Sequence, residues 1–174
     1  FLAFINDGHL QHMRVGADGG IGVKYLANKD AEVVGILGSG GMARTHMEAF
    51  TRVRNIEKLQ VFSPTRENRE RFGREMAAKY NFEVKVCNRT EDVYKGAHIL
   101  AALTDSAVEV TDGTLLEKGT HIVVVGGSGK PDAESLRRVD VYLRFGDTPA
   151  PVGHPELATD AEHIGYEARP QQHK

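Results

Sequence analysis

The sequence predicts an α/β protein with a Rossmann-type, doubly wound and mainly parallel sheet. From Glu32 onward, apolar strand-like runs alternate with helical stretches, which is the order expected of parallel strands joined by crossover helices. The first of these runs, Val33–Leu37, ends in the turn Gly38-Ser39-Gly40-Gly41-Met42-Ala43, where a helix begins. A G-x-G-x-x-A turn between a strand and a helix is typical of dinucleotide-binding sites.

Each element of this domain is predicted from its own pattern. The strands are short apolar runs, and the helices repeat apolar residues three or four positions apart, as in Ala43, Met47 and Phe50. We expect strands at 33–37, 59–62, 82–86, 99–103, 121–125 and 139–143, and helices at about 43–53, 67–80 and 91–95.

The residues before Glu32 have a different pattern. Phe1–Ile5 and Leu10–Val15 read as strands, and the Asp7-Gly8 pair between them predicts a hairpin. A helix is expected over Gly16–Asn28. Because the first run is apolar at odd and even positions alike, both of its faces should be covered, and we expect that residues upstream of Phe1 have been lost.

Composition narrows the class of protein. The 174 residues include 22 basic and 24 acidic side chains, a balance that gives no reason to expect nucleic-acid binding. No apolar run approaches the roughly 18 residues that a membrane-spanning helix needs. A single cysteine, Cys87, and the lack of a signal-peptide pattern favour a reducing, cytoplasmic setting.

The glycine turn provides what a pyrophosphate needs. Gly38 permits the tight turn, Gly40 lets backbone N–H groups approach the phosphates, and Ala43 replaces the third glycine where the helix packs on the strand. The phosphates would then lie at the positive end of the helix dipole.

The end of the second strand indicates which nucleotide is bound. An NAD site places Asp or Glu there to hold the ribose hydroxyls, whereas this chain has Ser63-Pro64-Thr65-Arg66. Two hydroxyls and an arginine favour NADP(H) over NAD(H). The alternative is that Thr65 is a helix N-cap and Arg66 a solvated charge.

Two further positions are candidates. Arg14, ahead of the glycine-rich helix, could bind a small carboxylate together with free helix N–H groups, although a strand-end arginine is more often an exposed charge. Thr104-Asp105-Ser106 ends the fourth strand at the sheet edge where ligands bind, and a plain turn with a helix cap at Asp105 explains it equally well.

Other polar residues carry less weight. The eight histidines show no spacing suited to a metal, so no metal site is predicted. Cys87 is expected in packing rather than as a nucleophile. Asn88-Arg89-Thr90 resembles a phosphate-binding triplet that follows the second strand in some NADP enzymes, but here it follows the third strand and is discounted.

With these residues in place, the chain resembles the ornithine cyclodeaminase and mu-crystallin family from about Leu2 to Asp140. The resemblance is carried by segments in the family's order and spacing. They are Leu2-Ala3-Phe4-Ile5 with Leu10, Arg14-Val15-Gly16-Ala17, Tyr25-Leu26-Ala27, Gly35 to Arg44, Val61-Phe62-Ser63-Pro64-Thr65, Leu103-Thr104-Asp105-Ser106, Lys118-Gly119-Thr120-His121-Ile122, Val125-Gly126 and Glu134.

The resemblance implies a homodimer whose Rossmann domain binds NAD(P) and whose second domain contacts a small amino or imino acid. Hydride would move between the substrate α-carbon and the nicotinamide, and Arg14 would bind the substrate carboxylate. Residues 1–30 would then be a fragment of the substrate and dimerisation domain, 31–148 the dinucleotide-binding domain and 149–174 a weakly structured end. Taken with the turn, the candidate cofactor residues are Gly38, Ser39, Gly40, Gly41, Met42, Ser63, Thr65, Arg66, Thr104, Asp105, Ser106, Val125 and Gly126.

The chain also departs from the family pattern. Val15 replaces a threonine, Met42 a usual glutamine and Val123 a frequent asparagine. The family's acid-base aspartate should fall near Leu143-Arg144-Phe145, where the nearest carboxylate is Asp147, and the segment with the family's active-site lysine is absent from this sequence. The catalytic residues are therefore left unassigned.

Three hypotheses follow. The first is an NADP(H)-dependent oxidoreductase or cyclodeaminase of this family. The second is a protein of the same fold that holds NADPH and a small ligand without meaningful turnover, which the departures would suit. A weaker third is a domain of the shikimate dehydrogenase type, disfavoured by the hairpin and Arg14 ahead of the glycine turn.

Overall fold

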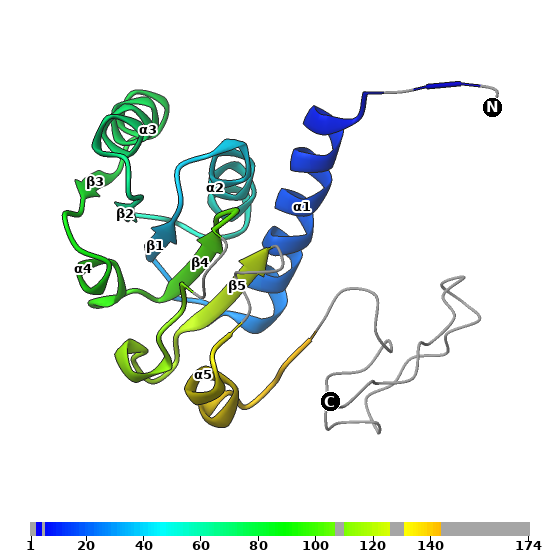
Figure 1. The fold of residues 1–174 in the computed structure, drawn as a ribbon. Coiled ribbons are helices and arrows are strands. Elements are labelled where there is room, and N and C mark those ends of the chain that lie inside the picture. The colour runs from blue at the N-terminus through cyan, green and yellow to red at the C-terminus, as the bar shows by residue number, and fades with distance from the viewer. Residues whose placement is uncertain (1–2, 5, 107–109, 126–130, 144–174) are drawn as a thin grey trace.

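The computed structural model describes residues 3–4, 6–106, 110–125 and 131–143, and it confirms the Rossmann-type architecture (Figure 1). Five parallel strands form one sheet in the order β3-β2-β1-β4-β5. The strands are β1 (Val33–Leu37), β2 (Lys58–Phe62), β3 (Glu83–Val86), β4 (Ile99–Leu103) and β5 (His121–Val125). The helices are α1 (Gly8–Leu26), α2 (Gly41–Val53), α3 (Arg66–Lys79), α4 (Glu91–Tyr94) and α5 (Ala133–Arg138), with a 3-10 turn η1 at Gly113–Leu115.

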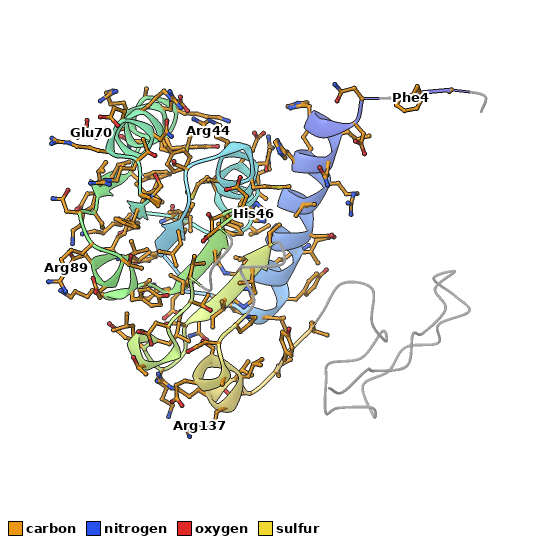
Figure 2. The ribbon with its side chains drawn as sticks, viewed as in Figure 1. Phe4, Arg44, His46, Glu70, Arg89 and Arg137 are labelled. Atoms are coloured by element: carbon orange, nitrogen blue, oxygen red, sulfur yellow. The ribbon has the colours of Figure 1, made fainter. Side chains whose placement is uncertain are left out.

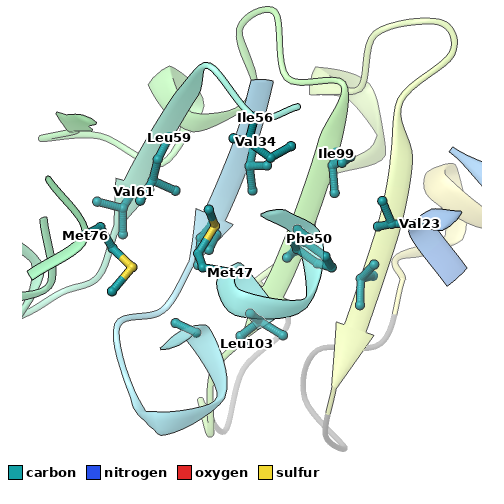
Figure 3. Close-up of a cluster of buried hydrophobic side chains, with 14 of the residues drawn as sticks. Val23, Val34, Met47, Phe50, Ile56, Leu59, Val61, Met76, Ile99 and Leu103 are labelled. Carbon is teal, nitrogen blue, oxygen red and sulfur yellow. The ribbon is translucent and has the colours of Figure 1, made fainter. Parts of the chain in front are cut away.

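Helices cover both faces of this sheet, so the central strands are buried on both sides. One face packs against α1, α2 and α3 through a large apolar cluster that includes Val23, Phe50 and Met76 (Figure 3). A smaller cluster on the other face joins Leu37 and Leu100 to α4. Burial on both faces explains why β1 and β4 read as continuous apolar runs rather than alternating ones.

The strand order reverses at β1. From β1 the chain passes through α2 to β2 on one side, and it later returns through α4 to β4 on the other side. The last residue of β1, Leu37, therefore pairs with both Phe62 and Ala102. In open α/β sheets, ligands bind in the crevice at the carboxyl ends of the strands, where this reversal occurs.

The predicted N-terminal hairpin is wrong. Leu10–Val15 lies inside α1, which begins at Gly8 rather than at Gly16, and Ala3 and Phe4 belong to no strand. The physical reason is close packing of α1 on α2: a Cβ added at Gly16 would lie 2.8 Å from the backbone of Thr45. The glycines of this segment therefore face a neighbouring helix and do not interrupt their own.

The predicted sixth strand is also wrong. Within 139–143 only Tyr142 forms a β-bridge, and the apolar side chains Val139, Val141 and Leu143 are 40%, 39% and 47% exposed. A strand needs a neighbouring edge to bond with, and apolar composition alone does not supply one. The predicted C-terminal segment, 149–174, lies outside the described residues. Among the described helices, none combines the length and apolar character needed to cross a bilayer.

Stability should fall as the pH drops below about 6.5, because of His121. Burial, helped by the charge of Arg54, lowers the pKa of this imidazole to about 4 in the folded chain. Between these values the unfolded state binds a proton that the folded state does not, so protonation favours unfolding. The free energy of unfolding, measured by urea denaturation, should fall by about 1–2 kcal/mol between pH 7 and pH 5.

A His121→Leu variant is the control for this pH dependence. It removes the titrating group, so its stability should change less over the same pH range than that of the wild type. Burial also lowers the pKa of His46, and a smaller slope of the same sign should remain in the variant. Identical slopes in the two proteins would show that His121 is not the group responsible.

Candidate functional site

The glycine turn begins at a position that only glycine can occupy. Gly38 has a φ of +121°, and a Cβ added there would collide with the carbonyl oxygen of Leu103 at the end of β4. Its N–H donates a 2.8 Å hydrogen bond to the carbonyl of Phe62 at the end of β2. The end of β1 is thus held between both neighbouring strands, at the crevice where the strand order reverses.

The next glycines leave the start of α2 open. Gly40 is the N-cap residue and makes no side-chain capping bond, and a Cβ added there would meet nothing within 4 Å. The first turn of α2 contains no acidic residue, so nothing there opposes the positive end of the helix dipole. Ala43 is fully buried, as expected for the position where the helix packs on the strand. Free amides, open space and a positive dipole suit an anion.

A histidine that sequence reasoning missed lies against this turn. His12 of α1 packs so closely on Gly41 that a Cβ at Gly41 would collide with the imidazole ring. The predicted alternation of a strand would not have placed His12 here, because the contact depends on α1 being helical. Met42, the residue after Gly41, is half-buried against the main apolar cluster. Its carbonyl oxygen lies 2.7 Å from Nδ1 of His46.

Arg44 fixes the shape of the turn. Its Nη1 donates to the carbonyl oxygens of Ser39 and Gly40, each at 2.9 Å, and its Nε donates to Oε2 of Glu75 on α3 at 2.8 Å. The guanidinium also lies 5.3 Å from the centre of the Phe72 ring. One side chain therefore ties the turn to α3, and the sequence pattern gave no signal for this role.

The end of β2 lies directly beside the turn. The hydroxyls of Ser39 and Ser63 share a 2.9 Å hydrogen bond, so these two predicted site residues are brought together. Thr65 is exposed at the N-cap position of α3, but its side chain makes no capping hydrogen bond. Arg66 is exposed, and its Nε donates to Glu70 at 2.6 Å. The hydroxyls and the cation are present at this edge, although Arg66 already has a carboxylate partner.

The ends of β4 and β5 complete the sheet edge. Thr104 follows β4, and its Oγ1 accepts a hydrogen bond from the N–H of Ser106 at 3.2 Å, with Asp105 exposed between them. Val125 ends β5, half-buried against the main cluster. Gly126 lies outside the described residues. The alternative of a helix cap at Asp105 depends on residues 107–109, which lie outside the described residues.

The predicted surroundings of Arg14 need correction. The residue lies inside α1 and is exposed, several positions after the helix start at Gly8. The backbone amides around it are therefore not the free amides of a helix N-terminus, which we expected to assist in binding a carboxylate. Two residues apart on a helix do not face the same way, so Arg14 and His12 point in different directions.

Other features of the described chain add no chemistry to this edge. A surface hollow of about 500 Å³ is lined by residues near the amino ends of β2 and β3, including Asn55 and Phe82. Cys87 is buried in the smaller cluster, and burial raises the pKa of its thiol. Across the described ranges, no three His, Cys, Asp or Glu side chains come together as a possible metal site.

The fold and the turn together define a Rossmann-type α/β domain with a glycine-rich connection from β1 to α2. The chain belongs to the ornithine cyclodeaminase/mu-crystallin family, whose model matches residues 1–150. This match, and not the predicted hairpin, is the reason to set aside the shikimate dehydrogenase alternative, because the hairpin prediction was wrong.

Individual relatives agree with the family. The chain is 30% identical over 135 residues to the ketimine reductase mu-crystallin of Rattus norvegicus, covering 78% of this chain and 42% of that protein. It is 31% identical over 135 residues to a Delta(1)-pyrroline-2-carboxylate reductase of Bacillus cereus, covering 78% and 41%. The chain thus spans about two fifths of the length of these relatives.

Solved structures give the same result. The Thermococcus litoralis Delta(1)-pyrroline-2-carboxylate reductase, in complex with NADH and L-proline, aligns with a TM-score of 0.72 at 26% identity. The alignment covers 97% of this chain and 58% of that one. An archaeal alanine dehydrogenase dimer with bound NAD aligns with a TM-score of 0.62 at 28% identity, over 67% and 35% of the two chains.

Proposed function

We propose that this chain is the nucleotide-binding part of an NAD(P)-dependent oxidoreductase that acts on a small amino or imino acid at its α-carbon. The observation that carries the proposal is the Gly38–Gly40 turn, which has the open space and free amides described above at the reversal point of the sheet. Relatives named as reductases of ketimines and pyrroline carboxylate supply the reaction class.

The residues present fit a dinucleotide. Gly38 would set the turn, the amides from Ser39 to Met42 would bind the pyrophosphate, and the open space over Gly40 would admit it. Thr104, Asp105 and Ser106 would lie near the nicotinamide end of the cofactor, with Val125 and Gly126 lining the same cleft. When bound, the nicotinamide supplies the hydride that is exchanged with the substrate α-carbon.

The substrate carboxylate is assigned to Arg14. An exposed guanidinium can bind a carboxylate through two parallel hydrogen bonds, which fixes the orientation of a small substrate. Residues 1–30 would belong to the substrate and dimerisation domain of the whole protein, which we propose to be a homodimer. The archaeal alanine dehydrogenase, whose structure is described as a dimer, supports that assembly.

NADP(H) is the proposed nucleotide. Residues 63–66 at the end of β2 include no carboxylate to repel a 2′-phosphate; Thr65 and Arg66 are exposed there, with the buried hydroxyl of Ser63 behind them. The hydrogen bond between Ser63 and Ser39 holds the end of β2 beside the turn, so a 2′-phosphate site there would adjoin the pyrophosphate site.

A second candidate function is binding without turnover. The segment Leu143-Arg144-Phe145 carries an arginine where the family has its acid-base aspartate, which inverts the local charge. Loss of a positioned acid or base lowers a rate by about 10²–10⁴. Val123 adds to this reading, because it packs in the main apolar cluster where the family often has a polar asparagine.

Incubating the 174-residue protein, and the whole protein that contains it, with NADPH and a panel of cyclic imino acids tests both candidates. Consumption of NADPH, followed by its absorbance at about 340 nm, is expected with at least one imino acid in the whole protein. Nucleotide binding is measured in parallel by titration calorimetry.

The outcomes separate the two candidates. Tight NADPH binding without consumption for any imino acid would favour the binder. No binding of NADPH or NADH by the 174-residue protein would overturn the assignment of the glycine turn. Consumption of NADPH by the whole protein supports the oxidoreductase.

A further inference from the structure

A buried arginine lies behind the end of β2. Arg69 of α3 is only 8% exposed, and its Nη1 donates to the carbonyl oxygens of Ser63 at 2.8 Å and Pro64 at 3.2 Å. Its Nη2 donates to Oδ1 of Asn88 at 3.3 Å, and its guanidinium lies 5.4 Å from the centre of the Phe62 ring. The Nε is buried and has no hydrogen-bond partner among the described residues.

The charge of Arg69 is not neutralised by a carboxylate. No Asp or Glu of the described ranges lies within ion-pair distance of it, whereas Arg66 pairs with Glu70 and Arg89 pairs with Glu91. Buried cations are normally paired, because removing an ion from water is costly. Arg69 therefore places a buried positive charge, with no ion-pair partner among the described residues, at the adenosine end of the proposed nucleotide site, where an anionic group would be stabilised.

Arg69 also connects the ends of three strands. The Ser39–Ser63 hydrogen bond joins the turn after β1 to the end of β2, and Arg69 joins Ser63 to Asn88 after β3. Asn88 itself is brought there by the Cys87 N–H, which donates to the carbonyl of Val61 at 2.8 Å. A continuous hydrogen-bonded path therefore runs along the sheet edge from the glycine turn to Asn88.

This arrangement gives a role to part of the discounted Asn88-Arg89-Thr90 triplet. Asn88 reaches the β2 end through Arg69, because β2 and β3 are neighbours in the sheet. Arg89 does not share this role: Figure 2 shows it beside α4, well away from Glu70 on α3. The triplet falls one strand too late in the sequence, yet one of its residues supports the loop after β2.

We infer that Arg69 is the positioning residue that makes this site select a 2′-phosphorylated dinucleotide, by shaping the Ser63–Thr65 segment and supplying the fixed positive charge behind it. The inference rests on the proposed function and extends it to a residue beyond the predicted set. A 2′-phosphate adds close to two negative charges, so its binding depends on this charge, whereas the ribose hydroxyls of NADH depend on it far less.

Titration of NADPH and NADH against variants of the 174-residue protein tests the inference. Arg69→Met retains an unbranched apolar stem against Phe62 but removes the charge and the forked contacts. It should weaken NADPH at least tenfold more than NADH. Arg69→Lys keeps the charge and should restore part of the NADPH preference. The matched control is Arg71→Met on the same helix, an exposed position whose Nη2 donates to Oδ1 of Asn68, and it should leave the ratio unchanged.

The outcomes distinguish the inference from the proposed function. Equal weakening of both nucleotides in Arg69→Met, or no change in either, would overturn the role of Arg69 while leaving the turn assignment intact. Failure of the wild type to bind either nucleotide would instead remove the proposed function. If Arg69→Met does not fold, Arg69→Lys and the wild type test the inference instead. The wild type must then bind 2′,5′-ADP at least fivefold more tightly than 5′-ADP. Absence of that preference contradicts the inference.

Discussion

Replacing Gly38 by alanine should abolish nucleotide binding and lower the free energy of unfolding by about 3 kcal/mol or more. Two effects add: a φ of +121° is strained for any residue with a side chain, and the new Cβ would collide with the Leu103 carbonyl. To relieve the collision, β1 and β4 would have to separate at the crevice that holds the turn. Urea unfolding monitored by circular dichroism gives the stability, and calorimetry with NADPH gives the binding.

Gly40→Ala is the matched control, because the same substitution two residues later meets open space. Its backbone lies in the extended region at φ −82°, and nothing lies within 4 Å of the added Cβ. Stability should stay within about 0.5 kcal/mol of the wild type. NADPH affinity should still fall at least tenfold, since the methyl group fills the space that the pyrophosphate needs. Unchanged affinity in Gly40→Ala would show that nucleotide does not approach the turn from this side.

The second large effect is expected at Arg54, where Arg54→Met should cost about 3 kcal/mol of stability. Its Nη2 donates to the carbonyls of Val23 and Ala27 at 2.8 Å and of Lys24 at 3.1 Å, and its Nε donates to that of Asn28 at 3.0 Å. These carbonyls lie in the last turn of α1 or just after it, where backbone donors are few: Val23 also accepts from the N–H of Ala27 at 3.3 Å and Asn28 from that of Ala31 at 3.1 Å. Losing the guanidinium should therefore loosen α1 first, measured as faster amide hydrogen exchange in that helix.

Two comparisons make the Arg54 result specific. Arg52→Met removes an exposed arginine that pairs with Glu48, and a surface pair of this kind should cost less than about 1 kcal/mol. Because the charge of Arg54 helps to lower the pKa of His121, that pKa should rise in Arg54→Met, as read from the imidazole signals in NMR. An unshifted His121, or equal destabilisation by the two substitutions, would contradict this account.

The sheet could be predicted from sequence because most of its strands are short runs of mainly apolar residues. Val33–Leu37, Ile99–Leu103 and His121–Val125 have the predicted bounds, and β2 and β3 differ from prediction by one residue at their starts. Burial on both faces leaves a strong local signal that does not depend on the rest of the fold. The run at 139–143 is also rich in apolar residues, but it forms only a single β-bridge at Tyr142 and its apolar side chains are largely exposed, so composition misled there.

The N-terminal helix could not be predicted because its signal is weak in sequence. Asp7-Gly8 resembles a hairpin turn, and Gly16, Gly19 and Gly20 resemble breaks in a helix. Their spacing of three or four residues places them on one face, against the backbone and side chains of α2. Recognising this requires knowing that a second helix packs there, which local propensity does not contain.

The site divides in the same way. The glycine turn and the residues after β2 could be predicted because an unusual backbone conformation requires glycine and because polar residues follow the apolar run of a strand. His12, Arg44 and Arg69 were missed because each acts on a segment brought near only by folding. The hydrogen bond between Ser39 and Ser63 could be anticipated only in outline, from the rule that neighbouring parallel strands end at one edge.

The contacts of Arg44 have one more consequence. Because this side chain donates hydrogen bonds to the carbonyls of Ser39 and Gly40 and to Glu75, the loop is preorganised before a ligand binds. A receptor that is already rigid surrenders little conformational entropy on complex formation, so more of the intrinsic contact energy appears as affinity. The rigidity of the loop thus depends on a cation at the end of the first turn of α2, outside the glycine motif itself.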